Sequence, residues 1–271
     1  MKSMREKEAE LRRLLGEMRS ALVAFSGGVD STFLVAVARE ALGERVVAVT
    51  AVSPAIPASE VEEARELARE IGVRHETIET LEMESTAYVR NAPDRCYHCK
   101  TGLFGQLGAM ARDMGLACVL DGSNRDDEGD YRPGRRAAVE QGVRSPLREA
   151  GLGKAEIRAL SKERGLPTWD KPSMACLASR IPYGTPVSVE ALRRIEAAEK
   201  LLRGLGLRQL RVRDHGKIAR IEADPDGMAL LMREDGRRFV VEGLKSLGYT
   251  YVALDMAGFR SGSLDEGLSI P

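Results

Sequence analysis

The fold is indicated by residues 21–31, which read ALVAFSGGVDS. The first five residues are uniformly apolar, which is the pattern of a short parallel strand buried on both faces. The glycines allow a sharp turn, and residues 32–40 continue in a helical pattern. A glycine-rich turn between a strand and a helix directs backbone N–H groups at one point. The stretch therefore predicts a phosphate-binding loop at the carboxyl edge of a parallel sheet.

The elements around this loop continue the alternation of strands and helices. A second buried strand is expected at residues 45–52, and further strands at residues 73–78 and 118–121. Between the first two of these, Ser59 and Glu62 form a capping-box signature that predicts the start of a helix. We therefore predict an α/β domain with a doubly wound parallel sheet over residues 1–165.

The pattern changes after residue 165, where the proline-punctuated connector GLPTWDKPS begins. A helix is expected from residue 188 to 203, then strands at 209–213 and 218–222, a single helix, and a last strand at 249–254. This order predicts a smaller α+β domain over residues 166–271.

The composition excludes several classes of protein. The 271 residues include 43% apolar residues, which can form a core, and no apolar run approaches the roughly 20 residues that span a bilayer. We expect a cytoplasmic protein that does not bind membranes. Basic and acidic residues number 41 each, and this balance disfavours a nucleic-acid partner. In a reducing compartment, the four cysteines are expected to be thiols, metal ligands or catalytic groups.

The glycine-rich loop and the end of the fourth strand supply candidate nucleotide ligands. The loop lacks the lysine of a Walker motif, but serine hydroxyls stand beside its backbone N–H groups. Carboxylates that follow a parallel strand lie at the same edge, where they can hold Mg²⁺ or a ribose. The expected ligands are Ser26, Gly27, Gly28, Asp30, Ser31, Asp121 and Asp126, with a solvated loop as the alternative for the last two and for Glu128.

SGGVDS after an apolar strand resembles the pyrophosphatase loop of the N-type ATP pyrophosphatases. In that superfamily the loop holds the pyrophosphate end of ATP while a substrate oxygen attacks the α-phosphate. Further blocks resemble the LarE-type sulfur transferases, and they lie at residues 91–100, 121–127, 131–134, 145–147, 171–181 and 211–216.

This resemblance implies a reaction and a substrate. LarE-type proteins adenylylate the carboxylates of pyridinium-3,5-biscarboxylic acid mononucleotide and replace oxygen with sulfur, which builds the nickel-pincer cofactor of lactate racemase. Adenylylation makes AMP the leaving group, so a sulfur nucleophile can attack. The resemblance also implies ATP and Mg²⁺ as cofactors, adenine near Thr50 and Ser53, a sulfur source as a partner, and a homo-oligomer.

Cys176 is the first candidate for handling the sulfur. It lies on the connector between Lys171 and Arg180, and cationic surroundings favour a thiolate. We therefore expect Cys176, Asp30 and Arg180 to be catalytic. The alternative for Cys176 is a buried structural thiol, which we expect for Cys118 in its apolar strand.

Cys96 and Cys99 form a CxxC pair, which alone fits zinc, a redox disulfide or an iron–sulfur cluster. The resemblance extends to a subgroup with this pair, and it implies a [4Fe–4S] cluster on Cys96, Cys99 and Cys176 whose extra sulfide is delivered. In other members the connector cysteine gives up its own sulfur and becomes dehydroalanine. A structural or adventitious pair is the remaining alternative. We expect His98 to lie at the surface or to contact the metal ligands, with a role as the fourth metal ligand as the alternative.

Arg211 and Arg213 alternate along a predicted strand and share one face. Paired guanidinium groups suit the phosphate or carboxylate of a small anionic mononucleotide, with a solvated or RNA-facing surface as the alternative. By family analogy, Glu199 and Glu222 are metal or subunit contacts, and ordinary exposed carboxylates are the other possibility.

Three other functions fit parts of the pattern. A tRNA thiolase of the same superfamily would bind tRNA with a steep salt dependence. An amidating ligase similar to NAD synthetase would need ammonia but no cysteine. A nucleotide sensor would bind ATP without converting it to AMP.

Overall fold

The computed structural model describes residues 2–129, 133–172, 175–260, 262–264 and 266. The chain divides into two compact units. The first consists of residues 1–85 and 94–174, and the second of residues 86–93 and 175–271. The change of unit after residue 174 lies close to the predicted boundary at 165, but the sequence pattern did not predict that residues 86–93 belong to the second unit.

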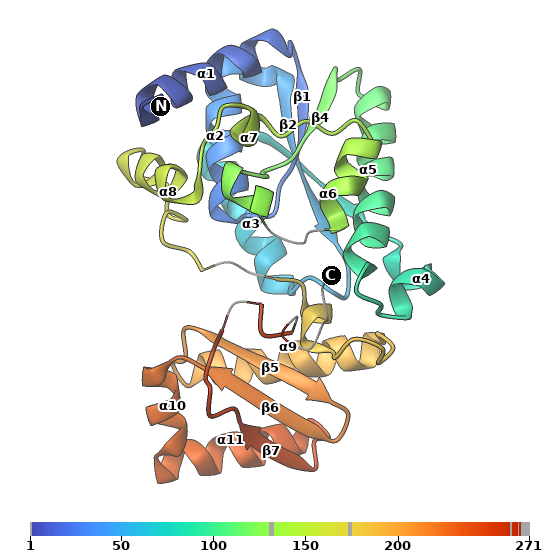
Figure 1. The fold of residues 1–271 in the computed structure, drawn as a ribbon, viewed down its shortest axis with the longest axis vertical. Helices are drawn as coiled ribbons and strands as arrows, with labels where there is room; N and C mark the ends of the chain where they lie inside the picture. Colours follow the sequence, from blue (N-terminus) through green and yellow to red (C-terminus); the bar gives the residue numbers. More distant parts are fainter. Residues whose placement is uncertain (1, 130–132, 173–174, 261, 265, 267–271) are drawn as a thin grey trace. The chain divides into compact units, whose positions relative to one another are not determined.

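The first unit contains a four-stranded parallel sheet in the order β3-β2-β1-β4, and Figure 1 labels three of these strands, β1, β2 and β4. The strands are β1 (Ala21–Ala24), β2 (Val46–Val52), β3 (Arg74–Glu79) and β4 (Cys118–Leu120). Ala21 lies beside Val46 of β2 and beside Cys118 of β4. The central strand β1 therefore delivers the glycine-rich loop to the carboxyl edge of the sheet, and the predicted doubly wound α/β fold is confirmed.

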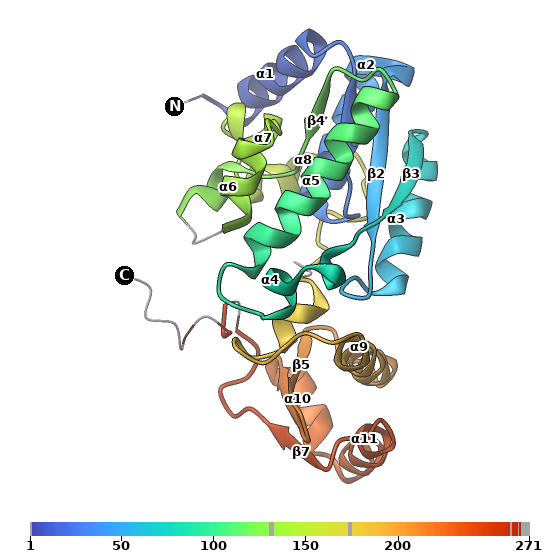
Figure 2. The ribbon, with the colours of Figure 1, turned by 90° about the vertical axis from the view of Figure 1, so that its right-hand side faces the viewer.

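Helices cover both faces of this sheet, as Figure 2 shows for α5 on one side and α3 on the other. One face carries α1 (Met4–Glu17), α2 (Val29–Leu42), α3 (Ala58–Ile71), α7 (Pro146–Glu149) and α8 (Lys154–Glu163). The opposite face carries α5 (Arg95–Asp113) and α6 (Pro133–Glu140). Short 3₁₀ helices lie at Gly43–Arg45, Glu82–Glu84 and Arg125–Gly129.

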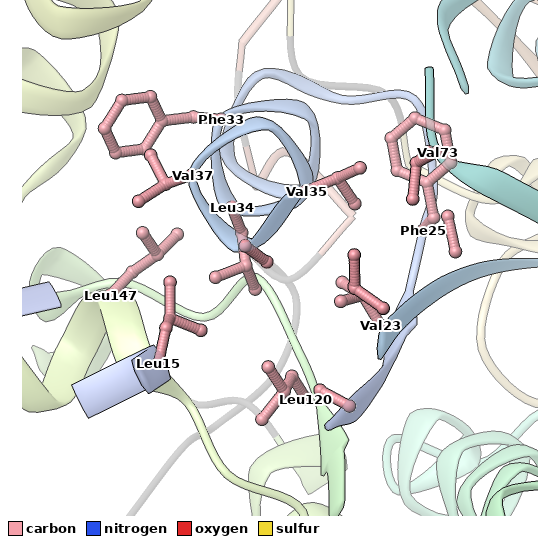
Figure 3. Close-up of a cluster of buried hydrophobic side chains, with 14 of the residues drawn as sticks. Leu15, Val23, Phe25, Phe33, Leu34, Val35, Val37, Val73, Leu120 and Leu147 are labelled. Atoms are coloured by element: carbon pink, nitrogen blue, oxygen red, sulfur yellow. The ribbon is translucent and has the colours of Figure 1, made fainter. Parts of the chain in front are cut away.

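The core of the first unit is built around α2. Phe33, Leu34, Val35 and Val37 are all fully buried, because the helix is enclosed by the sheet and by neighbouring helices (Figure 3). Burial of one such side chain contributes about 1.5–3 kcal/mol. This packing fixes the start of α2, and hence the loop before it.

The predicted capping box at the start of α3 is wrong. The helix begins at Ala58, its N-cap is Pro57, and no side chain caps it. Ser59 is already inside the helix, so its hydroxyl does not occupy the cap position. A capping box is instead present at the start of α1, between Ser3 and Glu6.

The second unit contains a three-stranded sheet in the order β5-β6-β7. Strands β5 (Leu210–His215) and β6 (Ile218–Ala223) are antiparallel, and β7 (Tyr251–Leu254) is parallel to β6. The helices are α4 (Thr86–Val89), α9 (Val189–Gly204), α10 (Pro225–Met232) and α11 (Glu234–Ser246), with a 3₁₀ helix at Leu177–Arg180. The predicted single helix is two helices, because Arg233 between them has an extended backbone.

The inner face of this sheet packs on α9, α10 and α11 through Val212, Ile221 and Leu244. Because side chains alternate along a strand, Arg211, Arg213 and Glu222 lie on the opposite face. None of the helices in the described ranges is long and apolar enough to cross a membrane.

Candidate active site

The glycine-rich loop has the geometry of an anion cradle. Gly27 has a φ of 65°, a left-handed conformation that favours glycine, and Gly28 is the N-cap of α2 without a side-chain cap. The Ser26 and Ser31 hydroxyl oxygens lie 3.1 Å apart, and the Ser31 hydroxyl donates to the carbonyl of Gly28. The first-turn N–H groups of α2 are therefore directed at a site lined by two hydroxyls, which fits a phosphate.

Asp30 lies in the first turn of α2, beside this cradle. Its Oδ2 accepts from Lys154 Nζ at 2.5 Å, whereas its Oδ1 is buried and has no hydrogen-bond partner among the described residues. Burial raises the pKa of Asp30, and Asp127 adds to this effect while Lys154 opposes it. A carboxylate oxygen buried without a partner fits a ligand for Mg²⁺, so Asp30 is the residue that would hold the ion.

Asp121 and Asp126 are both engaged in the loop that follows β4. Asp121 is buried and accepts from the Ser123 and Ser145 hydroxyls at 2.8 and 2.7 Å. Asp126 accepts from the backbone N–H of Lys154 at 2.7 Å, which lowers its pKa. These bonds brace the edge of the sheet, and direct contact of either carboxylate with ATP stays a prediction. The side chain of Glu128 lies outside the described part of the chain.

Two lysines that the sequence reasoning did not assign to the glycine-rich loop, Lys154 and Lys171, lie beside it. Besides Lys154, Lys171 Nζ lies 3.3 Å from the carbonyl oxygen of Gly27 and forms ion pairs with Glu60 and Glu63. Neither lysine is part of a short motif with the loop, so only the fold brings them together with it.

Thr50 and Ser53 lie at and just after the end of β2. The Thr50 hydroxyl donates to the carbonyl of Phe25 at 2.9 Å and lies 2.8 Å from Nε2 of His75. Because that hydroxyl proton is used, Nε2 of His75 is assigned as the donor to it. The Ser53 hydroxyl accepts from the N–H of Ala55. Both side chains thus shape the strand end, and adenine recognition there stays a prediction.

Cys96 and Cys99 lie one turn apart at the start of α5, so they share a face of the helix. Between them, Tyr97 donates to Glu140 at 2.7 Å and has the guanidinium of Arg136 over its ring. His98 lies 3.3 Å from Asp94. None of the four cysteines forms a disulfide, and Cys118 is partly buried, where burial raises its pKa.

The loop of Cys176 belongs to the second unit and is held by a buried arginine. Cys176 is half-buried and precedes the 3₁₀ helix Leu177–Arg180. Arg180, only 2% exposed, donates to the carbonyl oxygens of Ala175 and Cys176 at 2.8 and 3.3 Å. The other edge of its guanidinium binds the buried Glu199 at 2.8 and 3.2 Å. Arg180 therefore fixes the backbone around the thiol.

Asn91 braces the chain that follows Arg180, and the sequence reasoning did not select it. It is fully buried with a φ of 58°, and its side-chain amide donates to the carbonyls of Ile181, Pro182 and Thr185. This contact explains why residues 86–93 belong to the second unit. Asparagine tolerates a positive φ, and Asn91 is the first residue of the block 91–100 that resembles the LarE-type family.

Arg211 and Arg213 share a face as predicted, but their surroundings differ. Arg213 is 1% exposed and pairs with the buried Glu222 at 3.0 and 2.9 Å. Arg211 is half-buried, donates to the carbonyl of Arg260 and has no carboxylate partner among the described residues. Burial and the neighbouring Arg213 lower the pKa of Arg211 to about 10. Arg211 is thus the guanidinium with capacity for an anion, whereas Arg213 as a ligand stays a prediction.

Glu199 and Glu222 are not exposed carboxylates. Both are fully buried and each binds two arginines, Glu199 with Arg180 and Arg203, Glu222 with Arg213 and Arg220. The alternative of ordinary surface residues is therefore wrong.

The three cysteines predicted to hold a [4Fe–4S] cluster are divided between the units, with Cys96 and Cys99 in the first and Cys176 in the second. Within the described ranges, no three histidine, cysteine or carboxylate side chains are grouped to hold a metal ion. The cluster stays a prediction.

Comparison with known proteins places the chain in a family. The asparagine synthase family model matches residues 11–122, which include the glycine-rich loop. An uncharacterized protein of Synechocystis is 44% identical over 98% of this chain and 99% of its own length. A pyridinium-3,5-bisthiocarboxylic acid mononucleotide synthase of Lactiplantibacillus plantarum is 40% identical over 99% of this chain and 97% of its own. A tRNA-specific 2-thiouridylase of Azorhizobium caulinodans is 28% identical over 66% of this chain and 55% of its own.

The two relatives with 44% and 40% identity match almost from end to end, so they cover the loop, the CxxC helix and the Cys176 segment together. The resemblance inferred from the motifs is therefore confirmed. The chain belongs to the LarE-type family of ATP-dependent sulfur transferases, enzymes of the pyrophosphatase-loop superfamily that form thiocarboxylates.

Proposed function

We propose that this enzyme converts pyridinium-3,5-biscarboxylic acid mononucleotide into its thiocarboxylate form, the compound named in the description of the Lactiplantibacillus relative. A carboxylate oxygen of the substrate attacks the α-phosphate of ATP at the SGGVDS loop and pyrophosphate leaves. The Cys176 thiolate then attacks the acyl carbon, and AMP leaves with the original oxygen. Loss of the Cys176 α proton breaks its Cβ–Sγ bond, so the thiocarboxylate leaves and the cysteine becomes dehydroalanine. With the predicted cluster bound, Cys96, Cys99 and Cys176 would hold it and it would supply the sulfide, so that Cys176 would stay intact. The thiocarboxylate keeps the sulfur.

The observation that carries this proposal is the construction of the Cys176 loop. A buried arginine that holds two backbone carbonyls and a buried carboxylate is expensive to desolvate, and it gives the thiol a fixed position. A surface cysteine without a role needs no such support. We propose that Cys176 takes part in sulfur delivery and that Arg180 positions it.

Arg211 supports the choice of a small anionic substrate. A half-buried guanidinium with no carboxylate partner in the described chain is suited to a phosphate or carboxylate of the mononucleotide. An RNA-facing surface would instead present several exposed cations together, whereas the neighbouring Arg213 and Arg220 are neutralised by Glu222 and Asp255.

The test is the formation of AMP and of product by the purified protein with ATP, Mg²⁺ and the dicarboxylate mononucleotide. The account predicts AMP release that depends on the substrate, together with a product in which sulfur replaces oxygen. Cys176→Ala should abolish the sulfur product while some AMP still forms, because the activated carboxylate hydrolyses. Cys118→Ala is the matched control and should keep both.

Two outcomes would overturn the proposal. AMP release that requires tRNA would support the thiolase alternative, and release that requires ammonia and survives Cys176→Ala would support an amidating ligase. Intact mass after turnover separates the two sulfur sources: loss of one hydrogen sulfide marks a sacrificial Cys176, and an unchanged mass with repeated product marks a bound sulfide on the predicted [4Fe–4S] cluster.

A further inference from the structure

Lys154 brings a cation to a loop whose own sequence contains none. It is the first residue of α8, and it lies 124 positions from Asp30 in the chain. Its Nζ nevertheless lies 2.5 Å from Asp30 Oδ2. The side chains of Lys154 and Asp30 are 30% and 21% exposed, so a ligand at the cradle can reach both.

The backbone of Lys154 is fixed, whereas its side chain has one hydrogen-bond partner, Asp30, among the residues that the structure describes. Its N–H donates to Asp126 at 2.7 Å, and the preceding Gly153 N–H donates to Glu156 at 2.9 Å. The start of α8 is thus anchored independently of the loop. The ammonium can exchange its partner by side-chain rotation alone, without movement of the helix.

Lys171 is a different case, although it also lies beside the loop. Its side chain is 14% exposed, and its ammonium group is held by Glu60 and Glu63 at 2.8 and 2.9 Å. Two carboxylates neutralise it fully, so it has no charge to offer a further anion. Lys154 has only Asp30, whose second oxygen remains unpaired within the described residues.

We propose that Lys154 is the cationic ligand of the pyrophosphate end of ATP and that Asp30 holds its ammonium in place until the nucleotide binds. This inference rests on the proposed use of ATP at the loop. The phosphates carry more negative charge than one carboxylate, so they compete successfully for the ammonium. Exchange of the ammonium then leaves Asp30 free to receive the divalent cation.

Equilibrium binding of inorganic pyrophosphate to the full-length protein tests this exchange, with and without MgCl₂, by calorimetry. Lys154→Met should weaken pyrophosphate binding by about tenfold or more, and Lys154→Arg should restore most of it, because each charge-assisted hydrogen bond is worth that factor or more. Lys162→Met is the matched control, since Lys162 lies on the same helix over the ring of Trp169. It should bind pyrophosphate as the wild type does.

The direction in which Asp30→Asn changes the affinity for pyrophosphate is the decisive result. In the absence of Mg²⁺, removal of the carboxylate removes the competitor for Lys154, so binding should tighten by a few-fold, and the gain should disappear in the double variant with Lys154→Met. Unchanged binding by Lys154→Met, or weaker metal-free binding by Asp30→Asn, would overturn the exchange.

These results do not depend on the substrate. Failure of the proposed function appears as absent sulfur product in the wild type, whereas failure of the exchange appears only in the pyrophosphate titrations.

Discussion

Arg180 and Arg203 both bind Glu199, yet they differ in burial. Arg180 is enclosed, whereas the side chain of Arg203 is 36% exposed. An ion pair loses most when one partner is removed and the other remains buried, because the remaining charge has lost its compensation. Arg180 should therefore contribute to the stability of the Cys176 loop, whereas Arg203 makes a surface contact of small effect.

We expect Arg180→Met to lower the free energy of unfolding by about 3–5 kcal/mol. Arg203→Met, the control on the same carboxylate, should cost below about 1 kcal/mol because its guanidinium stays in contact with water. Urea unfolding measures both losses of free energy, provided that the slope of the free energy against urea concentration is the same in the two variants. Equal costs for the two variants would contradict the role of Arg180 as the buried anchor.

We expect the buried carboxylate of Asp30 to lower the stability of the fold while it serves the reaction. Its pKa is raised by burial, so in the folded state it binds a proton more readily than in the unfolded state. Its contribution to stability is therefore present at low pH and is lost as pH rises through the raised pKa. At pH 7 the ionised carboxylate costs stability, and Asp30→Asn removes that cost.

The expected result for Asp30→Asn is an equal or higher Tm at pH 7, with the advantage closing as pH falls toward about 4, the ordinary carboxyl range. Formation of AMP from ATP and Mg²⁺ should fall by about tenfold or more. Thermal unfolding across pH checks the first part. A lower Tm at pH 7, with the loss increasing with pH, would mean that the pair with Lys154 outweighs the burial of the carboxylate.

At the scale of elements, the approach of the loop after β4 to the start of α2 shapes the cradle. A Cβ on Gly122 would lie 3.1 Å from the backbone nitrogen of Ser31. That contact is with backbone, so it is relieved only by displacement of the loop or of the helix start. Packing therefore favours glycine at this position, because a methyl group would need a backbone shift of a few tenths of an ångström.

We predict that Gly122→Ala raises the KM for ATP and costs about 1–3 kcal/mol of stability, because the added methyl forces a backbone shift. Gly16→Ala is the control, since a Cβ there meets nothing within 4 Å. Inside α1 that change should be neutral or stabilising by up to about 1 kcal/mol. Steady-state kinetics and urea unfolding measure both, and an unchanged KM for Gly122→Ala would argue against the steric role.

The elements that the sequence predicted correctly have strong local signals. Apolar runs located β1, β2 and β4, whereas β3, which reads RHETIE, was located by its place in the alternation of strands and helices. Alternation along a strand placed Arg211 and Arg213 on one face. Local signals failed where tertiary packing decides, as at the start of α3 and at the break after Met232.

The contacts that complete the site were beyond prediction because they join distant residues. Lys154 reaches Asp30 only after the sheet has formed, and Asn91 joins the second unit through carbonyls that carry no sequence signal. The burial of Arg213 depends on the antiparallel register, in which Arg211 lies opposite Glu222 and Arg213 reaches the same carboxylate diagonally. A composition with equal positive and negative charge hides such internal pairing.

At the scale of the whole molecule, the chain combines a unit for nucleotide binding with a unit that holds Cys176. We propose that an ATP-activated carboxylate receives sulfur through that cysteine. Residues 86–93 belong to the second unit, and the chain returns to the first unit at residue 94. The CxxC pair at Cys96 and Cys99 therefore follows directly after a segment of the second unit. Transfer of the sulfur atom to the substrate requires both ATP activation and Cys176, so following that atom tests the proposed roles of both units.

The most direct measurement is a single turnover by protein in which all sulfur carries a heavy isotope, with the product analysed by mass spectrometry. The account predicts that heavy sulfur replaces an oxygen of the mononucleotide only when ATP is present, and that Cys176→Ala yields none. A product that keeps its oxygen, or heavy-sulfur product formed equally well by Cys176→Ala, would contradict it.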